Sequence, residues 1–102
     1  MKCVQTRGVQ SFFRIVAGTA RSQAATMILQ PGQATGGQDN VHPESDQWLY
    51  VVSGSGAAIV EGRRVELAVG ALLLIEAGET HEIVNQGPEP LVTVNVYAPS
   101  AY

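Results

Sequence analysis

The sequence predicts an all-β fold, built as an antiparallel sandwich or barrel. Apolar and β-branched residues recur in short runs, and turn-forming residues separate these runs. No segment shows the 3.6-residue apolar period of an amphipathic helix. The chain of 102 residues contains 11 glycines and 5 prolines, which are enough to supply a turn between most neighbouring runs.

Three strands are predicted in the first half of the chain, at residues 12–16, 24–30 and 47–53. In the third run, residues 47, 49 and 51 share one face, and residues 48, 50 and 52 share the other. Both faces are apolar apart from Gln47 at the start of the run. This pattern is typical of the wall of a filled barrel, with a polar site where the strand begins.

Five further strands are predicted at residues 57–60, 63–68, 71–75, 80–85 and 91–98. Glu61 and Gly62 separate the first two of these runs and predict a hairpin turn. The run 71–75 has helical propensity, but the space between Gly70 and Gly78 is too short for a stable helix. We therefore predict a buried strand there. In the last run, valines alternate with Thr93, Asn95 and Tyr97, and the sequence leaves open which set points inward.

Composition excludes several classes of function for what we expect to be a single domain over residues 1–102. The net charge is −3 and no basic cluster exists, so a nucleic-acid partner is not predicted. No apolar run approaches the roughly 18 residues of a membrane span, so no membrane partner is predicted either. The lone Cys3 and the absence of an apolar secretory segment predict a cytoplasmic protein.

The two histidines, His42 and His81, are the candidate chemical residues. They lie far apart in the chain, each near a predicted strand end. Gly78 permits the left-handed backbone that a short turn before His81 requires. Strand alternation places His81, Ile83 and Asn85 on one face.

Residues 70–85 resemble the second sequence motif of the cupin superfamily, whose members are small jelly-roll barrels, also called double-stranded β-helices. That motif is Gly, five residues, Pro, one residue, Gly, two residues, His, three residues and Asn. Four positions match it in register: Gly70, Gly78, His81 and Asn85. Glu76 stands where the family usually has proline.

Residues 34–54 resemble a degenerate first cupin motif, which runs Gly, five residues, His-x-His, three or four residues, Glu, six residues and Gly. Gln47 and Gly54 have the spacing of its Glu and its last Gly. His42 then aligns with the second histidine and Asn40 with the first, while Ala34 takes the place of the opening glycine.

The resemblance implies one divalent metal ion such as Zn, Mn, Fe or Ni, and its ligand set becomes Asn40, His42, Gln47 and His81. Glutamine is a metal ligand in some cupins, including the enzymes that open unsaturated uronic acids. Its amide oxygen suits harder cations but carries no charge. Asn40 also reads as a turn residue, and Glu44 is an alternative carboxylate if its loop folds inward.

Other apolar and aromatic residues are candidates for contacts with a substrate or a partner. Met27, Tyr97 and Phe12 are candidate pocket residues, and the alternative for each is ordinary core packing. Trp48 and Tyr50 are candidates for an outer face that packs against a second sheet or another subunit. The resemblance implies a homodimer, which is common among cupins of this size.

Three functions stay open at this point. The first is a small metal-binding cupin, which as an enzyme would act on a small carbonyl, enol or sugar-like substrate. The second is a non-catalytic barrel that has lost its metal and binds a sugar or organic acid through His42, Gln47 and His81. The third is a structural homodimer. Many catalytic cupins carry Arg or Asp near the C-terminus, and residues 98–102 contain neither, which weakens the case for a sugar-acid enzyme.

Overall fold

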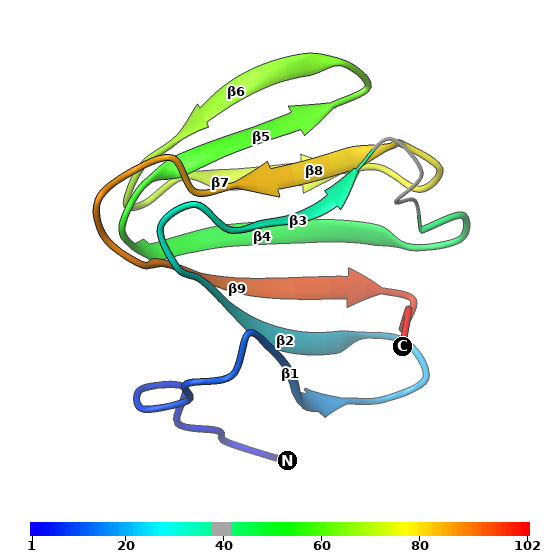
Figure 1. Cartoon of the computed structure of the whole chain (residues 1–102). Helices are drawn as coiled ribbons and strands as arrows, with labels where there is room; N and C mark the ends of the chain where they lie inside the picture. The colour runs from blue at the N-terminus through cyan, green and yellow to red at the C-terminus, as the bar shows by residue number, and fades with distance from the viewer. Residues whose placement is uncertain (38–41) are drawn as a thin grey trace.

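Two antiparallel β-sheets make up the fold in a computed structural model that describes residues 1–37 and 42–102 (Figure 1). The described residues contain nine strands, namely β1 (Phe13–Gly18), β2 (Gln23–Leu29), β3 (Ala34–Gly37), β4 (Asp46–Ser53), β5 (Gly56–Val60), β6 (Arg63–Leu67), β7 (Leu72–Ile75), β8 (His81–Val84) and β9 (Leu91–Ala98). One sheet has the order β1-β2-β9-β4-β7, and the other has the order β3-β8-β5-β6. The same residues contain no helix, which confirms the predicted all-β class.

Strand β3 is the element that the sequence pattern does not predict. It spans Ala34–Gly37 and pairs with β8, so that Thr35 lies opposite Ile83 and Gly37 opposite His81. Two glycines in four residues give this segment little intrinsic preference for a strand. The pairing with β8 therefore determines its conformation.

The predicted hairpin turn at Glu61 and Gly62 is confirmed. It joins β5 to β6, and both residues have positive φ, 49° and 77°. Glu61 tolerates this backbone because its surroundings hold it: its main-chain N–H donates to the Thr80 carbonyl, and its carboxylate accepts from the Thr80 hydroxyl at 2.7 Å. These bonds tie the β5–β6 hairpin to the start of β8.

The core lies between the inner faces of the two sheets. Its buried residues come from both sheets and are Met27, Leu29, Leu49, Val51, Ala58, Leu67, Ile83 and Leu91. Strand β4 alternates as predicted, with Leu49 and Val51 inside and Trp48 and Tyr50 exposed. The run 71–75 contains the predicted strand, β7, but the prediction that it is buried is wrong, because Leu72 and Leu74 are exposed on the outer face of the five-stranded sheet. On β9 the inward set is Thr93, Asn95 and Tyr97, all buried, which answers the question that the sequence left open.

One end of the barrel, where β4 finishes and β9 begins, is closed by close approach of backbones. A Cβ atom on Gly54, which has a φ of 82°, would lie 2.1 Å from the Pro90 carbonyl oxygen. A Cβ on Gly56 would lie 2.4 Å from the Val84 carbonyl oxygen. Asn85 links the end of β2 to the segment before β9, because its side-chain amide donates to the Leu29 and Glu89 carbonyls at 2.9 and 2.7 Å. We call this region the closed end.

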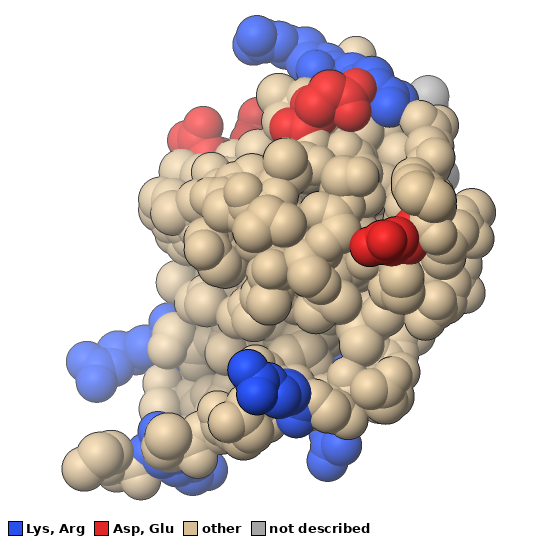
Figure 2. Space-filling view, turned by 90° about the vertical axis from the view of Figure 1, so that its left-hand side faces the viewer, with Lys and Arg blue, Asp and Glu red and all other residues tan. Residues whose placement is uncertain are grey.

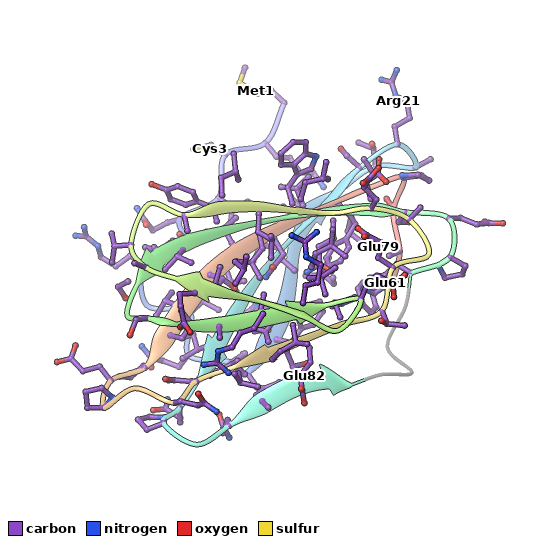
Figure 3. The ribbon with its side chains drawn as sticks, turned by 90° about the horizontal axis from the view of Figure 1, so that it is seen from above. Met1, Cys3, Arg21, Glu61, Glu79 and Glu82 are labelled. Atoms are coloured by element: carbon purple, nitrogen blue, oxygen red, sulfur yellow. The ribbon has the colours of Figure 1, made fainter. Side chains whose placement is uncertain are left out.

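Uncharged residues make up much of one face of the molecule. On the face that Figure 2 shows, Lys and Arg lie toward the top and bottom, Asp and Glu lie near the top and at one side, and uncharged residues cover the centre. Figure 3 shows Met1 and Cys3 outside the sheets and Glu82 pointing away from the barrel. In the parts of the chain that the structure describes, no helix is long and apolar enough to cross a membrane.

Candidate functional site

The opposite end of the barrel, which we call the mouth, brings together residues from distant parts of the chain. Strands β4 and β8 begin there and β9 ends there, and Gln47 lies opposite Tyr97 in the β4–β9 register. A cavity of about 110 Å³ opens at this end and is lined by Phe12, Phe13, Met27, Thr35, His42, Gln47, His81, Ile83, Tyr97 and Tyr102.

Most of the predicted site residues line this cavity. His42, Gln47 and His81 lie in its wall, together with the predicted pocket residues Met27 and Tyr97. Asn40, the fourth predicted ligand, lies outside the described residues. Glu44 is exposed, and the described residues hold no group of three or more His, Cys, Asp or Glu side chains that could bind a metal ion.

The turn before β8 places the two histidines side by side. The Gly78 N–H donates to the His42 carbonyl at 2.9 Å, and the Ala77 N–H donates to the Asp46 carboxylate at 2.9 Å. Gly78 has a φ of 85°, the left-handed conformation that its position in the sequence predicts. These bonds hold the segment before β4 against the start of β8, so His42 meets His81.

The separation of the two imidazoles is compatible with a shared ion. Their ring centroids are 5.1 Å apart, with an interplanar angle of 35°. Two imidazoles bound to one ion through bonds of about 2.1 Å have centroids about 5 Å apart. His81 is buried, and its Nδ1 lies 3.4 Å from the Glu79 carbonyl oxygen.

Gln47 supplies a buried oxygen at the same place. Its side-chain nitrogen donates to Asn95 Oδ1 at 3.3 Å, and Asn95 in turn donates to the Thr93 hydroxyl at 3.1 Å. Gln47 Oε1 is buried and accepts no hydrogen bond from any described residue. A buried carbonyl oxygen without a partner is costly and calls for an ion or donor from outside the chain. Two imidazoles and this oxygen therefore fit a divalent cation.

Both imidazoles are predominantly neutral at neutral pH. Burial lowers the pKa of His42, and the neighbouring His81 lowers it further. Burial also lowers the pKa of His81, although the main-chain oxygen and the carboxylate of Glu79 oppose this shift. Neutral imidazole is the form that binds a metal ion.

Aromatic rings form the outer part of the mouth. The aromatic cluster consists of Phe13, His42, Tyr97 and Tyr102. Tyr102 contacts the other three, with centroid distances of 5.1 Å to Phe13, 5.4 Å to His42 and 5.1 Å to Tyr97. Its hydroxyl lies 3.4 Å from His42 Nε2. Gln23 holds Tyr102 in place, donating to its main-chain oxygen at 2.8 Å and accepting from its N–H at 2.9 Å.

Phe13, Asn95 and Tyr102 are among the residues of the mouth that are not predicted from the sequence. A signal exists for Phe13, because strand alternation places Phe12 and Phe13 on opposite faces and the Phe13–Met27 register turns Phe13 inward. A signal also exists for Asn95, an amide within a valine-rich strand. No local signal identifies Tyr102, because Gln23, which holds it, is 79 residues away in the sequence.

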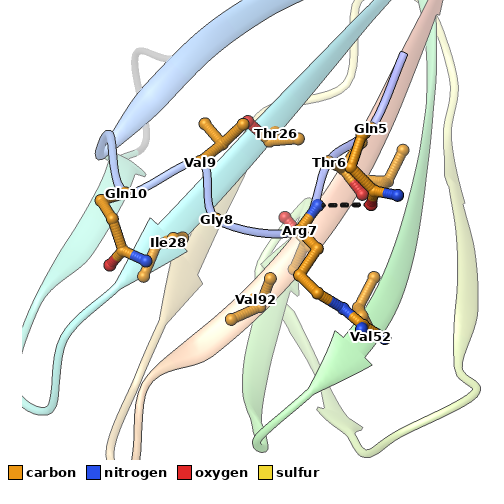
Figure 4. Close-up of a pocket in the computed structure, with 12 residues that line it drawn as sticks. Gln5, Thr6, Arg7, Gly8, Val9, Gln10, Thr26, Ile28, Val52 and Val92 are labelled. Atoms are coloured by element: carbon orange, nitrogen blue, oxygen red, sulfur yellow. Dashed lines mark hydrogen bonds between the residues drawn. The ribbon is translucent and has the colours of Figure 1, made fainter. Parts of the chain in front are cut away.

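A second cavity, of about 360 Å³, lies between residues 5–10 and the outer face of the five-stranded sheet (Figure 4). Its floor includes Ile28 and Val52, and the Thr26 hydroxyl is buried there without a hydrogen-bond partner among the described residues. The N–H of Arg7 donates to the Gln5 side chain at 2.9 Å within its wall. Among the described residues that line this cavity there is no His, Asp or Glu, so the candidate metal ligands lie at the mouth.

Comparisons with known proteins agree with this architecture. The sequence model of a family described as "Cupin domain" matches residues 25–97. The tetracenomycin polyketide synthase protein TcmJ of Streptomyces glaucescens is 34% identical over 73 residues, which are 72% of this chain and 48% of that protein. The chain therefore spans about half the length of this curated relative.

Solved structures resemble the whole fold. The protein BH2720 from Bacillus halodurans superposes with a TM-score of 0.85 and 27% identity, over 93% of this chain and 75% of that one. A Klebsiella pneumoniae protein with a double-stranded β-helix domain gives a TM-score of 0.81 and 28% identity, over 97% of this chain and 86% of that one. The predicted jelly-roll architecture is thus confirmed.

Proposed function

Because the chain belongs to the cupin family, we propose that its barrel mouth binds one divalent metal ion through His42, Gln47 and His81. The observation that carries this proposal is the buried Gln47 Oε1, which lacks a hydrogen-bond partner among the described residues and shares a small cavity with two imidazoles. Imidazole nitrogens with one amide oxygen suit ions such as Zn, Mn, Fe or Ni. Asn40 or water would complete the ligand set.

A metal ion at this position would supply a Lewis acid for a carbonyl or enol oxygen of a small substrate. The chain's own residues prepare the site. Asn95 fixes the Gln47 amide so that its oxygen stays available. The Glu79 carbonyl accepts from Nδ1 of His81, which favours the tautomer that carries its proton on Nδ1.

The remaining wall excludes water and offers a hydrogen bond. Met27 and Ile83 form an apolar floor, and Tyr97 is buried beside them. Burial raises the pKa of Tyr97 far above its usual value, and its interactions with Tyr102, including a side-chain hydrogen bond, raise it further, so the hydroxyl keeps its proton. A substrate oxygen would have to take the place of Tyr102 as the partner of this hydroxyl.

A carbonyl or enol substrate also agrees with the Streptomyces relative. The name of that protein associates it with a polyketide synthase. Polyketides are rich in carbonyl and enol oxygens. We extend this chemistry to the present chain as part of the proposal, together with the alternative of a small sugar-like substrate.

Metal content and affinity test the proposal. Protein purified without chelator, or reconstituted, should carry about one equivalent of a divalent ion by elemental analysis. Gln47→Leu and His81→Ala should each weaken binding at least tenfold by calorimetry, because each removes one ligand. Gln10→Leu, an equivalent change at an exposed position, is the matched control. Less than about a tenth of an equivalent after reconstitution would contradict the proposal.

A second function is favoured by the neutral character of the site. No carboxylate lines the cavity beside the two histidines among the described residues, and the Glu79 carboxylate, which interacts with His81, lies outside that lining. The cavity wall therefore brings no negative charge to balance an ion. The alternative is a non-catalytic barrel that binds a small sugar or organic acid through His42, Gln47 and His81. Equal thermal stabilisation by a ligand before and after chelation would support this alternative, and loss of the stabilisation on chelation would exclude it.

We also propose that the protein is a homodimer, with the outer face of the five-stranded sheet as its interface. Trp48 and Tyr50 are exposed there, and the β4–β7 register places them beside Leu74 and Leu72, which are also exposed. On the other side of Trp48 lies Val96, exposed as well. A contiguous apolar surface of this kind is typical of a contact between proteins, and a second copy of this chain presents the same surface.

A further inference from the structure

The wall of the mouth is aromatic on several sides. The aromatic cluster takes Phe13 from β1, His42 from the segment before β4, Tyr97 from β9 and Tyr102 from beyond it. Its four rings are held at centroid distances between 5.1 and 5.4 Å, and three of the contacts are edge-to-face. Such a wall offers ring faces and edges to a further flat ring, and these contacts favour aromatic over aliphatic molecules.

Among the described residues, the mouth has no basic side chain. No Lys or Arg lines the cavity among the described residues, and residues 38–41 contain none in the sequence. A carboxylate held by the protein wall would therefore lose its hydration without gaining a cationic partner, which is strongly unfavourable. The wall thus selects against anionic molecules.

The phenol side chain of Tyr102 lies at the edge of this site. The Tyr102 hydroxyl lies 3.4 Å from His42 Nε2, while the Tyr102 ring packs on Tyr97 and Phe13. The contact shows that a ring fits this wall with its hydroxyl directed toward the histidine. The inner space has the same surroundings, with Gln47 and His81 as the polar groups and Met27 and Ile83 as the apolar ones.

The remaining space limits the size of a ligand. The cavity has a volume of about 110 Å³, whereas a closed cavity of ~150 Å³ binds a whole benzene ring. The cavity at the mouth therefore holds a single ring only if one edge of that ring extends toward solvent. Tyr102 forms the outer boundary, because Gln23 fixes its main chain from both sides.

From these observations we propose that the mouth binds a neutral, planar ring with a hydroxyl or enol group, and that Tyr102 sets the upper limit on its size. This inference rests on the proposed function, since it names the ligand class of the same site. The polar group of the ring faces His42, Gln47 and His81, and its flat faces contact the aromatic cluster.

Methyl-labelled methionine provides a direct test. The chain has 2 methionines: Met27 lines the cavity, whereas Met1 is exposed and distant from it. In chelated protein, phenol should shift the Met27 methyl NMR signal saturably and leave the Met1 signal unchanged. Cyclohexanol, which has a similar size but no aromatic ring, should bind at least fivefold more weakly. Benzoate, which is charged, should bind at least tenfold more weakly.

These outcomes are separate from those of the metal test. If benzoate or cyclohexanol binds as tightly as phenol, or if phenol leaves Met27 unmoved, the ring inference is overturned even when the metal binds. If phenol is preferred but no metal binds after reconstitution, the ring inference stands and the proposed metal function fails.

Variants at position 102 test the size limit. Tyr102→Ala should weaken phenol binding about fivefold, because it removes one aromatic wall. It should strengthen binding of 2-naphthol at least fivefold, because the second ring gains space. Tyr102→Phe keeps the ring and should change neither affinity by more than twofold. If the ratio of the phenol affinity to the 2-naphthol affinity is the same in Tyr102→Ala as in the parent protein, Tyr102 does not set the upper limit on ligand size.

Discussion

Gln47 stands where the first cupin motif has a glutamate, and its surroundings can hold either an amide or a carboxylate. Asn95 faces Gln47 with an amide that can present its N–H groups to an oxygen after rotating about its last bond. For the proposed cation, the neutral side chain of Gln47 would give a lower affinity than a carboxylate would. Asn95 could serve as hydrogen-bond partner for either side chain.

We predict that Gln47→Glu tightens divalent metal binding at least tenfold, because it adds a negative charge beside the ion. Calorimetric titration with Zn or Mn measures the change. Gln10→Glu, which adds the same charge at an exposed position, should leave the affinity within about twofold. If the Gln47→Glu variant binds no tighter than the parent, Gln47 does not contact the ion.

The lowered pKa values of His42 and His81 predict a pH-dependent stability in metal-free protein. Burial favours the neutral rings in the folded state, whereas the unfolded rings titrate near 6.5. Below that pH the unfolded state therefore binds more protons, and the free energy of unfolding falls. The stabilisation is fully present above the unfolded value and is lost as the pH drops toward the lowered folded pKa values.

Urea unfolding of chelated protein at several pH values between 5 and 8 measures this effect. His81→Gln, which cannot titrate, should flatten the dependence in that range. Equal slopes for the parent and the variant would show that burial of His81 does not influence its protonation. Glu61, whose pKa is lowered chiefly by its hydrogen bonds to Thr80, contributes in the same direction but only at more acidic pH.

Among the strands and turns, the glycines at the closed end impose the strictest local requirement. Gly54→Ala should destabilise the protein by about 3 kcal/mol or more, because it combines a left-handed backbone with a collision against the Pro90 carbonyl. Gly70→Ala has a similar φ of 90° but open space around its Cβ, so it should cost only about 1–2 kcal/mol. Chemical denaturation gives both values, and equal losses would mean that the backbone conformation alone matters at Gly54.

Strand alternation and turn chemistry predict most of the elements. The run that begins at Gln47 and the motif that ends at Asn85 have the predicted faces, because their inward residues alternate with period two. Strand β3 escapes prediction because it depends on pairing with β8 rather than on its own residues. The position of Tyr102 likewise depends on Gln23, a partner that is distant in sequence and invisible to any local pattern.

For the molecule as a whole, the exposed apolar face predicts self-association. Trp48→Glu should convert the proposed homodimer into a monomer, because a charge would be buried without a partner at the centre of that face. Light scattering coupled to size-exclusion chromatography measures the mass. Val65→Glu is the control, because Val65 is similarly exposed but lies on β6 of the other sheet. A parent protein that is monomeric at high concentration would contradict the proposal.

The two ends of the barrel differ in how they would respond to evolutionary change. At the closed end, main-chain atoms approach so closely that a side chain does not fit at Gly54 or Gly56. At the mouth, separate segments each contribute side chains, and Tyr102 is largely exposed, so its replacement changes contacts at the rim and leaves the core between the sheets intact. Random mutagenesis with selection for a new ligand should therefore collect its changes at the mouth. Descendants of this protein could therefore acquire different ligands at the mouth while they keep the same closed end.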